Sequence, residues 1–143
     1  FRKFYKSYCY ADTSAVSGTE VAQILGQNPE QVFKTLVTVS GNGGHYVFVI
    51  PVAEELDLKK AAKAVGEKSI AMLKSRELLP LTGYIHGGCS PIGMKKFFTT
   101  VIDETAQLFD TIIFSAGKIG YQVEVSPEEL QNVIPFTFAD ITV

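Results

Sequence analysis

Two strand-like segments on either side of a glycine-rich turn are the feature that most constrains this fold. Residues 32–40 (VFKTLVTVS) are rich in β-branched side chains, which are enriched in strands. Residues 41–44 (GNGG) are a strong turn signal, and residues 46–50 (YVFVI) form a second strand. Together they predict a β-hairpin over residues 32–51. Because the returning strand is almost wholly apolar, we expect it to be buried on both faces.

Shorter segments with helix and strand patterns flank this hairpin. Ser17 and Glu20 have capping-box spacing and predict a helix that stops at Gly26. Residues 58–65 predict an amphipathic helix that ends at Gly66. The other predicted elements are strands within residues 4–10, 69–71, 98–103, 111–115, 121–125 and 136–141, and helices over residues 74–79 and 126–133. Allowing for the weakest of these segments, we count six or seven strands with three or four helices, which indicates an α+β domain with a mixed sheet.

Length and composition exclude several classes of protein. The 143 residues fit one domain, and 46% hydrophobic with 20% charged residues is typical of a globular chain. No apolar run approaches the roughly 18–20 residues that span a bilayer, and the first residues lack the apolar core of a signal peptide. Cys9, Cys89, His45 and His86 show no zinc-site spacing. We therefore expect a cytoplasmic protein without metal or cofactor, with two free thiols in preference to a disulfide.

The net charge of −2 conceals an uneven distribution along the chain. Residues 59–96 contain eight basic and two acidic side chains, a balance of +6, whereas residues 97–143 have a balance of −6. A basic region on an acidic protein suits a polyanion that docks on one side. Solvated faces of ordinary helices explain the same lysines equally well at this point.

Three features could carry chemistry. Lys34 lies on a strand with apolar neighbours, where a fixed cation could hold a phosphate or an oxyanion, although many strand lysines simply face solvent. Residues 87–93 (GGCSPIG) offer closely spaced backbone N–H groups for an anion-binding nest, or form a structural turn. Residues 115–120 (SAGKIG) repeat the combination of small residues and one cation.

No conventional nucleophile or base accompanies these features. Cys89 has no basic partner near it in the sequence, and His86 is expected to pack or to form a hydrogen bond. The paired acids at residues 54–55 and 128–129 lie at helix starts, where the helix dipole explains them. The residues alone therefore predict a domain with two glycine loops, a strand lysine and a basic middle, without defining a reaction.

Four segments, in matching order and spacing, resemble the YbaK/EbsC family. They are residues 31–36 (QVFKTL), 56–64 (LDLKKAAKA), 82–84 (TGY) with 87–93 (GGCSPIG), and 115–120 (SAGKIG). The likeness runs from about Tyr8 to Ile141. This family includes free-standing relatives of the editing domain that is inserted in bacterial prolyl-tRNA synthetases. The family's usual N-terminal helix has no counterpart, and the chain starts without Met, so we expect its beginning to be missing.

The resemblance implies a fold, an activity and partners. The fold would be a strongly curved mixed sheet of six or seven strands flanked by helices, formed by residues 1–143 as one domain. The activity would be removal of cysteine from mischarged tRNA(Pro), or of alanine as in related members. Aminoacyl-tRNA would be the substrate, and prolyl-tRNA synthetase a further partner. The substrate's own thiol would attack its ester, so that the enzyme supplies position and electrostatics only.

The resemblance also assigns site residues. The family's key lysine falls on Lys34, the predicted catalytic residue. The predicted substrate-binding residues are Tyr8, Thr35, Gly87, Gly88, Ser90, Pro91, Ser115 and Gln122. The lysines predicted to contact tRNA are Lys59, Lys60, Lys63, Lys95 and Lys118.

Gln122 departs from the family pattern, because YbaK-type members carry an aspartate there. A neutral amide can replace a carboxylate only as a hydrogen-bonding group. This difference bears on amino-acid specificity, so alanine or another small amino acid is an alternative to cysteine. It also keeps open a non-catalytic module that binds tRNA or a synthetase, and a small-molecule or nucleotide-binding domain without a tRNA role.

Overall fold

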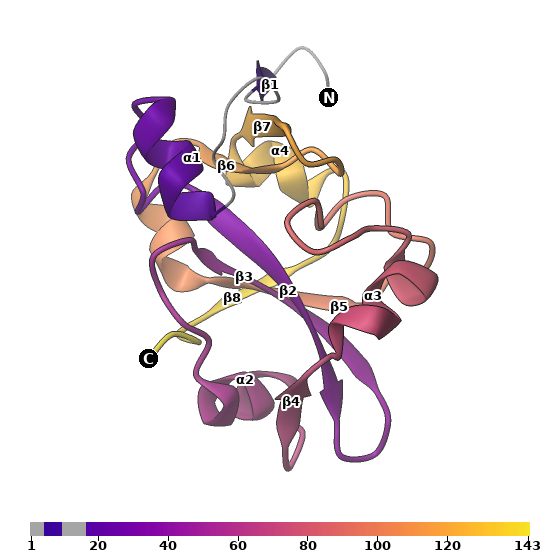
Figure 1. Cartoon of the computed structure of the whole chain (residues 1–143). Coiled ribbons are helices and arrows are strands. Elements are labelled where there is room, and N and C mark those ends of the chain that lie inside the picture. The colour runs from indigo at the N-terminus through magenta and orange to yellow at the C-terminus, as the bar shows by residue number, and fades with distance from the viewer. Residues whose placement is uncertain (1–4, 10–16) are drawn as a thin grey trace.

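The structure, a computed structural model, describes residues 5–9 and 17–143. These residues form eight strands in two sheets (Figure 1). The smaller sheet has the order β1 (Tyr5–Cys9), β7 (Tyr121–Val125), β6 (Ile112–Ser115). The larger sheet has the order β4 (Ile70–Met72), β2 (Phe33–Ser40), β3 (His45–Pro51), β5 (Thr99–Asp103), β8 (Thr137–Ala139).

The α+β class and the mixed sheet are confirmed. In the larger sheet β2 pairs antiparallel with β3 and β4, whereas β5 pairs parallel with both β3 and β8. The smaller sheet is antiparallel throughout. The strands do not form one sheet of six or seven, because a single bridge, Val32 to Ile113, connects the start of β2 with β6. The two sheets therefore stay separate and meet at this bridge.

The hairpin that the sequence predicts is present, with Phe33 opposite Pro51 and Val39 opposite His45. The returning strand β3 is buried from Val47 to Pro51, as its composition predicts. Its two faces belong to different parts of the core. Val47 and Val49 pack in the cluster that reaches β6 and α4 (Pro127–Gln131), whereas Phe48 and Ile50 pack against α2 (Leu58–Val65).

Local capping explains most of the helix boundaries. Helix α1 (Gly18–Ile24) starts at Ser17, whose Oγ accepts a hydrogen bond from the Glu20 N–H at 3.2 Å. Helix α2 starts at Asp57, whose carboxylate accepts from two backbone N–H groups, and ends at Gly66 with φ +72°. Helix α4 starts at Ser126, which caps Glu129 in the same way. These predicted helix starts and the predicted stop at Gly66 are confirmed.

Helix α3 (Ser75–Thr82) continues three residues beyond the predicted end at residue 79, although Pro80 lies inside it. The Thr82 hydroxyl donates to the Leu78 carbonyl at 2.8 Å, and Gly83 closes the helix in the left-handed conformation. Helix α4 ends at Gln131, two residues before its predicted end. A 3-10 helix, η2 (Glu104–Leu108), follows β5. Within residues 5–9 and 17–143, the helices are all too short or too polar to cross a membrane.

Candidate functional site

A cavity of about 470 Å³ opens between α1, the first half of β2 and the two glycine-rich loops. Five of the predicted site residues line it although they come from distant parts of the chain. They are Lys34, Thr35, Gly87, Ser115 and Gln122. The corner where the two sheets meet brings them together, because the bridge at Val32 sets the start of β2 beside β6.

Lys34 supplies a charge to this cavity that no acidic side chain offsets. It lies opposite Ile50 in the hairpin and is half-buried. The described residues that line the cavity include no aspartate or glutamate. Within the described parts of the chain, no carboxylate lies within ion-pair distance of the Lys34 ammonium. The cavity therefore has a positive potential that favours an anion or a developing negative charge.

Thr35 lines the cavity, but its hydroxyl is enclosed. Its Oγ1 is buried and has no hydrogen-bond partner among the described residues. Buried hydroxyls are nearly always paired, so this unpaired one is an exception, and it reaches a bound molecule only if the Thr35 side chain rotates.

The two glycine-rich loops pack directly on each other. Gly88 lies against the 118–119 backbone, and a Cβ atom at Gly117 would come within 2.9 Å of the Tyr84 ring. Gly87 has φ +88°, which side chains rarely permit, and lies against the Ile119 side chain. The loops thus form one rim, in which some backbone N–H groups are already bonded: Gly88 donates to the Ile85 carbonyl at 3.0 Å and Gly117 to the Ser115 hydroxyl at 3.2 Å.

Three predicted substrate-binding residues lie in this rim without lining the cavity. Gly88, Ser90 and Pro91 are buried within the first loop. The Ser90 hydroxyl accepts a hydrogen bond from the Ile92 N–H at 3.3 Å, which shapes the turn. His86, which we expected to pack or to form a hydrogen bond, is instead exposed at the cavity. The sequence identifies the loop but not which of its residues face inward, since that depends on the packing of the second loop.

Tyr8 does not line the cavity but neighbours a residue that does. It is opposite Gln122 in the β1–β7 pair, and its hydroxyl donates to the Glu124 carboxylate. This hydrogen bond raises the pKa of Tyr8. Burial would raise the pKa of Glu124, but hydrogen bonds from Thr111 and Tyr8, together with the charge of Lys6, outweigh burial and lower it. Tyr8 therefore does not line the cavity, and its hydroxyl is bound to Glu124 on the neighbouring strand β7.

Gln122 is buried, with 5% of its surface exposed. Its Oε1 accepts a hydrogen bond of 2.9 Å from Nε2 of Gln27, in the turn after α1. The sequence offered no signal for Gln27, because a single glutamine in a turn belongs to no motif and its partner is 95 residues away.

Cys89 lines the cavity but is not activated as a nucleophile. Its side chain is buried, and burial raises the pKa of the thiol to about 12. A thiol with this pKa is protonated at neutral pH, whereas nucleophilic cysteines are thiolates stabilised by a cation or a base. The absence of a partner in the sequence and the burial in the structure lead to the same conclusion.

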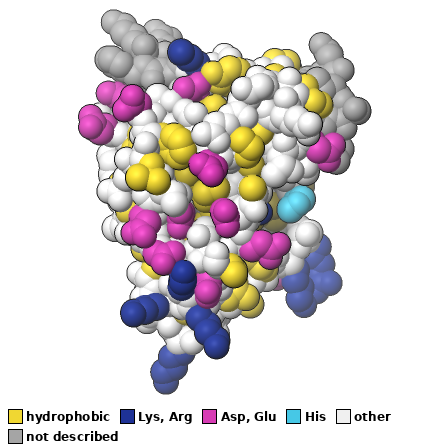
Figure 2. All heavy atoms as spheres, turned by 90° about the vertical axis from the view of Figure 1, so that its left-hand side faces the viewer, with side chains coloured by type: hydrophobic (Ala, Val, Ile, Leu, Met, Phe, Trp, Pro, Cys, Tyr) yellow, Lys and Arg dark blue, Asp and Glu magenta, His cyan; other side chains and the backbone are white. Residues whose placement is uncertain are grey.

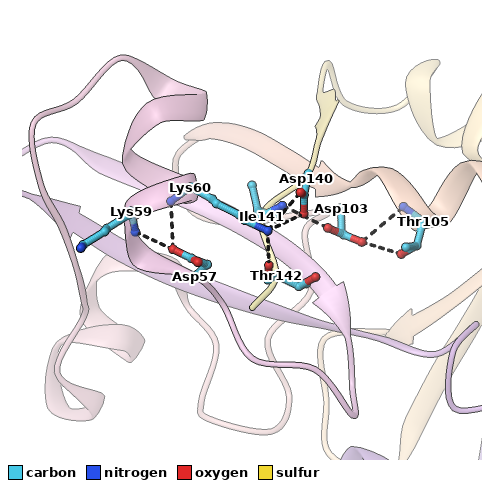
Figure 3. Close-up of polar contacts among 8 residues, drawn as sticks. All are labelled: Asp57, Lys59, Lys60, Asp103, Thr105, Asp140, Ile141 and Thr142. Atoms are coloured by element: carbon cyan, nitrogen blue, oxygen red, sulfur yellow. Dashed lines mark hydrogen bonds and ion pairs between the residues drawn. The ribbon is translucent and has the colours of Figure 1, made fainter.

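The predicted tRNA-contacting lysines differ in their surroundings. Lys59, Lys63, Lys95 and Lys118 are exposed. Lys60 instead forms an ion pair of 3.0 Å with Asp140 and donates to the Thr142 carbonyl at 2.8 Å, which ties α2 to the end of the chain (Figure 3). Figure 2 shows Lys and Arg side chains gathered at the lower end of one face, where α2 and β4 lie in Figure 1. Acidic side chains occupy the middle of that face, and some also lie beside the basic ones.

Solved structures share this architecture. A crystal structure named as a trans-editing enzyme for prolyl-tRNA synthetase is 27% identical, with a TM-score of 0.85 over 97% of this chain and 87% of the other. The hypothetical protein APE2540 has a TM-score of 0.87 at 24% identity, covering 97% of this chain and 91% of its own, and shows the shared fold.

Sequence relatives define the family. A protein of Enterococcus faecalis named as the Cys-tRNA(Pro)/Cys-tRNA(Cys) deacylase EbsC is 50% identical over 139 residues, which are 96% of this chain and 85% of that protein. The proline–tRNA ligase of Thermodesulfovibrio yellowstonii is 30% identical over 81% of this chain, which corresponds to 18% of the ligase. The model of the aminoacyl-tRNA editing domain matches residues 13–133. The chain therefore belongs to the aminoacyl-tRNA editing domain family.

Proposed function

We propose that this protein is an aminoacyl-tRNA deacylase that removes cysteine from mischarged tRNA, with Cys-tRNA(Pro) as its principal substrate. The naming of the EbsC relative supports this substrate class. The observation that carries the proposal is the composition of the cavity wall. It offers a lysine ammonium and a glycine, Gly87, but no carboxylate among the described residues and only a neutral thiol at Cys89.

Such a wall can stabilise negative charge but cannot supply a nucleophile. The attacking group must then come from the substrate. The cysteine sulfur of the bound ester attacks its own carbonyl carbon, which forms a C–S bond and breaks the C–O bond to the terminal ribose. The proton of the thiol passes to the ribose oxygen, so that intact tRNA and a cyclic thioester leave, and water later opens the thioester.

Lys34 acts in this scheme as a fixed positive charge. It lowers the energy of the substrate thiolate and of the oxyanion that develops on the carbonyl. The backbone around Gly87 faces the same carbonyl, and Thr35 lies beside Lys34 in the wall that meets the acceptor end. Ser115 and Gln122 complete the wall on the opposite strands. The exposed lysines at positions 59, 63, 95 and 118 hold the tRNA body, and such contacts with phosphates dominate nucleic-acid affinity.

The partners follow from the same proposal. Prolyl-tRNA synthetase produces the mischarged substrate, and the chain resembles a segment of such ligases. A free-standing domain can meet the substrate after release or while it is bound to the synthetase, in the cytoplasm where tRNA is charged.

A deacylation panel tests the proposal. Cys-, Ala-, Ser- and Pro-tRNA are incubated with wild-type protein and with Lys34→Ala and Lys34→Met, and Lys68→Met serves as a control because Lys68 is exposed and does not line the cavity. We expect rapid loss of cysteine, abolished by either Lys34 variant and unchanged in the control. Lack of turnover on every ester, or full activity of Lys34→Ala, would refute the proposal.

The same panel separates the competing functions. Serine and alanine esters lack the thiol, so equal rates on all esters would indicate attack by water. Faster turnover of Ala-tRNA would assign the alternative substrate. Tight, salt-dependent tRNA binding without cleavage would instead indicate a non-catalytic module.

A further inference from the structure

A second hollow, of about 340 Å³, shares the loop of residues 87–93 with the cavity that holds Lys34. Gly87 and Cys89 of this loop line the cavity, whereas Pro91 and Gly93 line the hollow. Two residues of an extended chain span at most about 7 Å, so the walls of the two spaces come at least this close at Cys89 and Pro91. A long ligand that occupies the cavity therefore has the hollow as its neighbour.

An exposed aromatic ring forms part of the wall of the hollow. Phe97, in the segment before β5, has 52% of its surface exposed. The other phenylalanines within residues 5–9 and 17–143 are buried or half-buried. Val133 and Pro135, which follow α4, are further apolar residues of the wall and are also exposed. Concave surfaces with apolar and aromatic walls are typical of ligand sites.

The backbone is held in place on both sides of Phe97. The Lys95 N–H donates to the Thr82 carbonyl, at the end of α3, at 3.0 Å. Phe98 is buried in the core with 9% of its surface exposed. Phe97 thus projects from a fixed backbone, and a preorganised side chain of this kind loses less conformational freedom on binding than one on a loose segment.

The charge at the hollow is positive. Lys96 lines it, and Lys95 is exposed next to Lys96 in the sequence. The described residues that line the hollow include no aspartate or glutamate, and the acids Glu128 and Glu129 lie in the first turn of α4. An aromatic face beside a cation is the combination that binds single-stranded nucleic acid, because the ring stacks on a base and the cation meets a phosphate.

We propose that the hollow binds an unpaired base of the tRNA 3′ end, which stacks on Phe97 while Lys96 contacts a neighbouring phosphate. This inference rests on the proposed deacylase function, because an aminoacyl group in the cavity brings the preceding nucleotides to the loop of residues 87–93. Every base has an aromatic face, so stacking of this kind holds the strand without reading its sequence.

Binding of uncharged RNA tests this base site without any turnover. The probes are a tRNA acceptor minihelix with its unpaired 3′ end and the same duplex with a blunt end. We expect Phe97→Ala to weaken binding of the minihelix about tenfold, as for loss of one base stack, and binding of the blunt duplex to stay the same. Phe97→Trp should bind the minihelix at least as tightly as the wild type. Phe97→Leu, which is apolar but has no aromatic face, should lose most of what Phe97→Ala loses.

Leu108→Ala is the matched control for these substitutions. Leu108 is apolar, has 78% of its surface exposed and lines neither the cavity nor the hollow. We expect this variant to bind both RNAs as the wild type does.

Abasic nucleotides identify the base that stacks on Phe97. An abasic nucleotide replaces, in turn, each of the two nucleotides before the terminal adenosine. At one position it should weaken binding to the wild type about tenfold and have little further effect on Phe97→Ala, because both changes remove the same contact. Losses that multiply at both positions would show that no base in this strand stacks on Phe97.

The salt dependence tests the role of Lys96. In Lys96→Gln the slope of log affinity against log salt should fall by about 0.7 for the minihelix, the value for one phosphate of a single strand. The slope for the blunt duplex should not change. An equal change for both RNAs would place the Lys96 contact on the duplex and overturn this part of the proposal.

These outcomes also separate the base site from the proposed function. A wild type that does not cleave Cys-tRNA refutes the function, whereas RNA binding still decides on Phe97. Equal affinity of wild type and Phe97→Ala for the minihelix overturns the inference, and so does a wild type that binds the minihelix no better than the blunt duplex. If a variant unfolds, which thermal melting reveals, the abasic probes decide with the wild type alone: no loss at either position overturns the inference.

Discussion

Gly88 and Ile119 are in backbone contact: a Cβ atom at position 88 would come within 3.1 Å of the Ile119 nitrogen and 3.4 Å of the Lys118 carbonyl carbon. Their loops are about thirty residues apart in the sequence, and this contact joins them into the rim of the cavity. No side chain intervenes, so the distance between the loops depends on the absence of a single methyl group.

Gly88→Ala is therefore expected to displace one loop from the other. The obstructing atoms are backbone and cannot rotate away, and overpacking of this kind costs about 1–3 kcal/mol. We expect deacylation to fall more than tenfold while circular dichroism stays that of the wild type. Gly44→Ala is the control, since its Cβ would meet only side-chain atoms in the hairpin turn. Equal activity of both variants would show that the rim tolerates movement.

The parts of this fold that depend on local sequence could be predicted. The capping of α1 by Ser17 and the end of α2 at Gly66 follow from residues within one turn, and the hairpin follows from composition around its turn. The end of α3 was predicted too early, at residue 79, whereas the Thr82 hydroxyl and Gly83 stabilise a later one beyond Pro80.

The side-chain partnerships of the site could not be predicted in the same way. Tyr8 with Glu124 and Gln27 with Gln122 bring together residues from opposite ends of the chain. No spacing rule encodes such pairs, because they depend on how the two sheets meet. The resemblance to known editing domains predicts Lys34, the loops, Tyr8 and Gln122, but not the partners Gln27 and Glu124.

Chemical labelling should distinguish the two cysteines. Cys9 is exposed, whereas Cys89 is buried with its pKa raised by burial to about 12. At pH 8 iodoacetamide should modify Cys9 alone in the native protein and both cysteines after unfolding, as peptide mass spectrometry would show. Cys89→Ser should retain most of the deacylase activity. Rapid native labelling of Cys89, or an inactive but folded Cys89→Ser, would restore it as a candidate nucleophile.

The raised pKa of the Cys89 thiol predicts that the stability of the protein changes at alkaline pH. The folded pKa is raised above the value of about 8.5 in an unfolded chain, so the unfolded state releases this proton first. The contribution of Cys89 to the free energy of unfolding is complete below about pH 8.5 and declines as the pH rises toward 12. Urea titrations between pH 7 and 10 should show a smaller alkaline loss for Cys89→Ala than for the wild type. Parallel curves for the two proteins would argue against the raised pKa.

The lowered pKa of Glu124 predicts that the free energy of unfolding has the opposite pH dependence in the acidic range. Its folded pKa is lowered, so its contribution to stability is present above the unfolded value of about 4.3 and is lost as the pH falls through the folded value. Glu124→Gln should reduce the free energy of unfolding at pH 7 by about 1 kcal/mol, an amount discounted for solvent screening, and the difference should shrink below pH 4. Glu128→Gln, in the exposed first turn of α4, is the control. A constant difference from pH 3 to pH 7 would mean that the charge of Glu124 is not involved.

Substitutions of the lysines of α2 should have different effects, according to the partners of each lysine. Lys59 and Lys63 are exposed, whereas hydrogen bonding to Asp140 holds Lys60 and raises its pKa. Replacing Lys59 and Lys63 together by Gln should weaken tRNA binding and reduce the slope of log affinity against log salt by about 0.7 to 0.9 for each phosphate that is no longer neutralised. Lys60→Gln should leave the slope nearly unchanged and lower the melting temperature instead. Asp140→Asn supplies the complementary test, because it releases the Lys60 ammonium. Binding should then tighten at low salt if α2 faces the tRNA, and unchanged binding in all these variants would place the tRNA on another face.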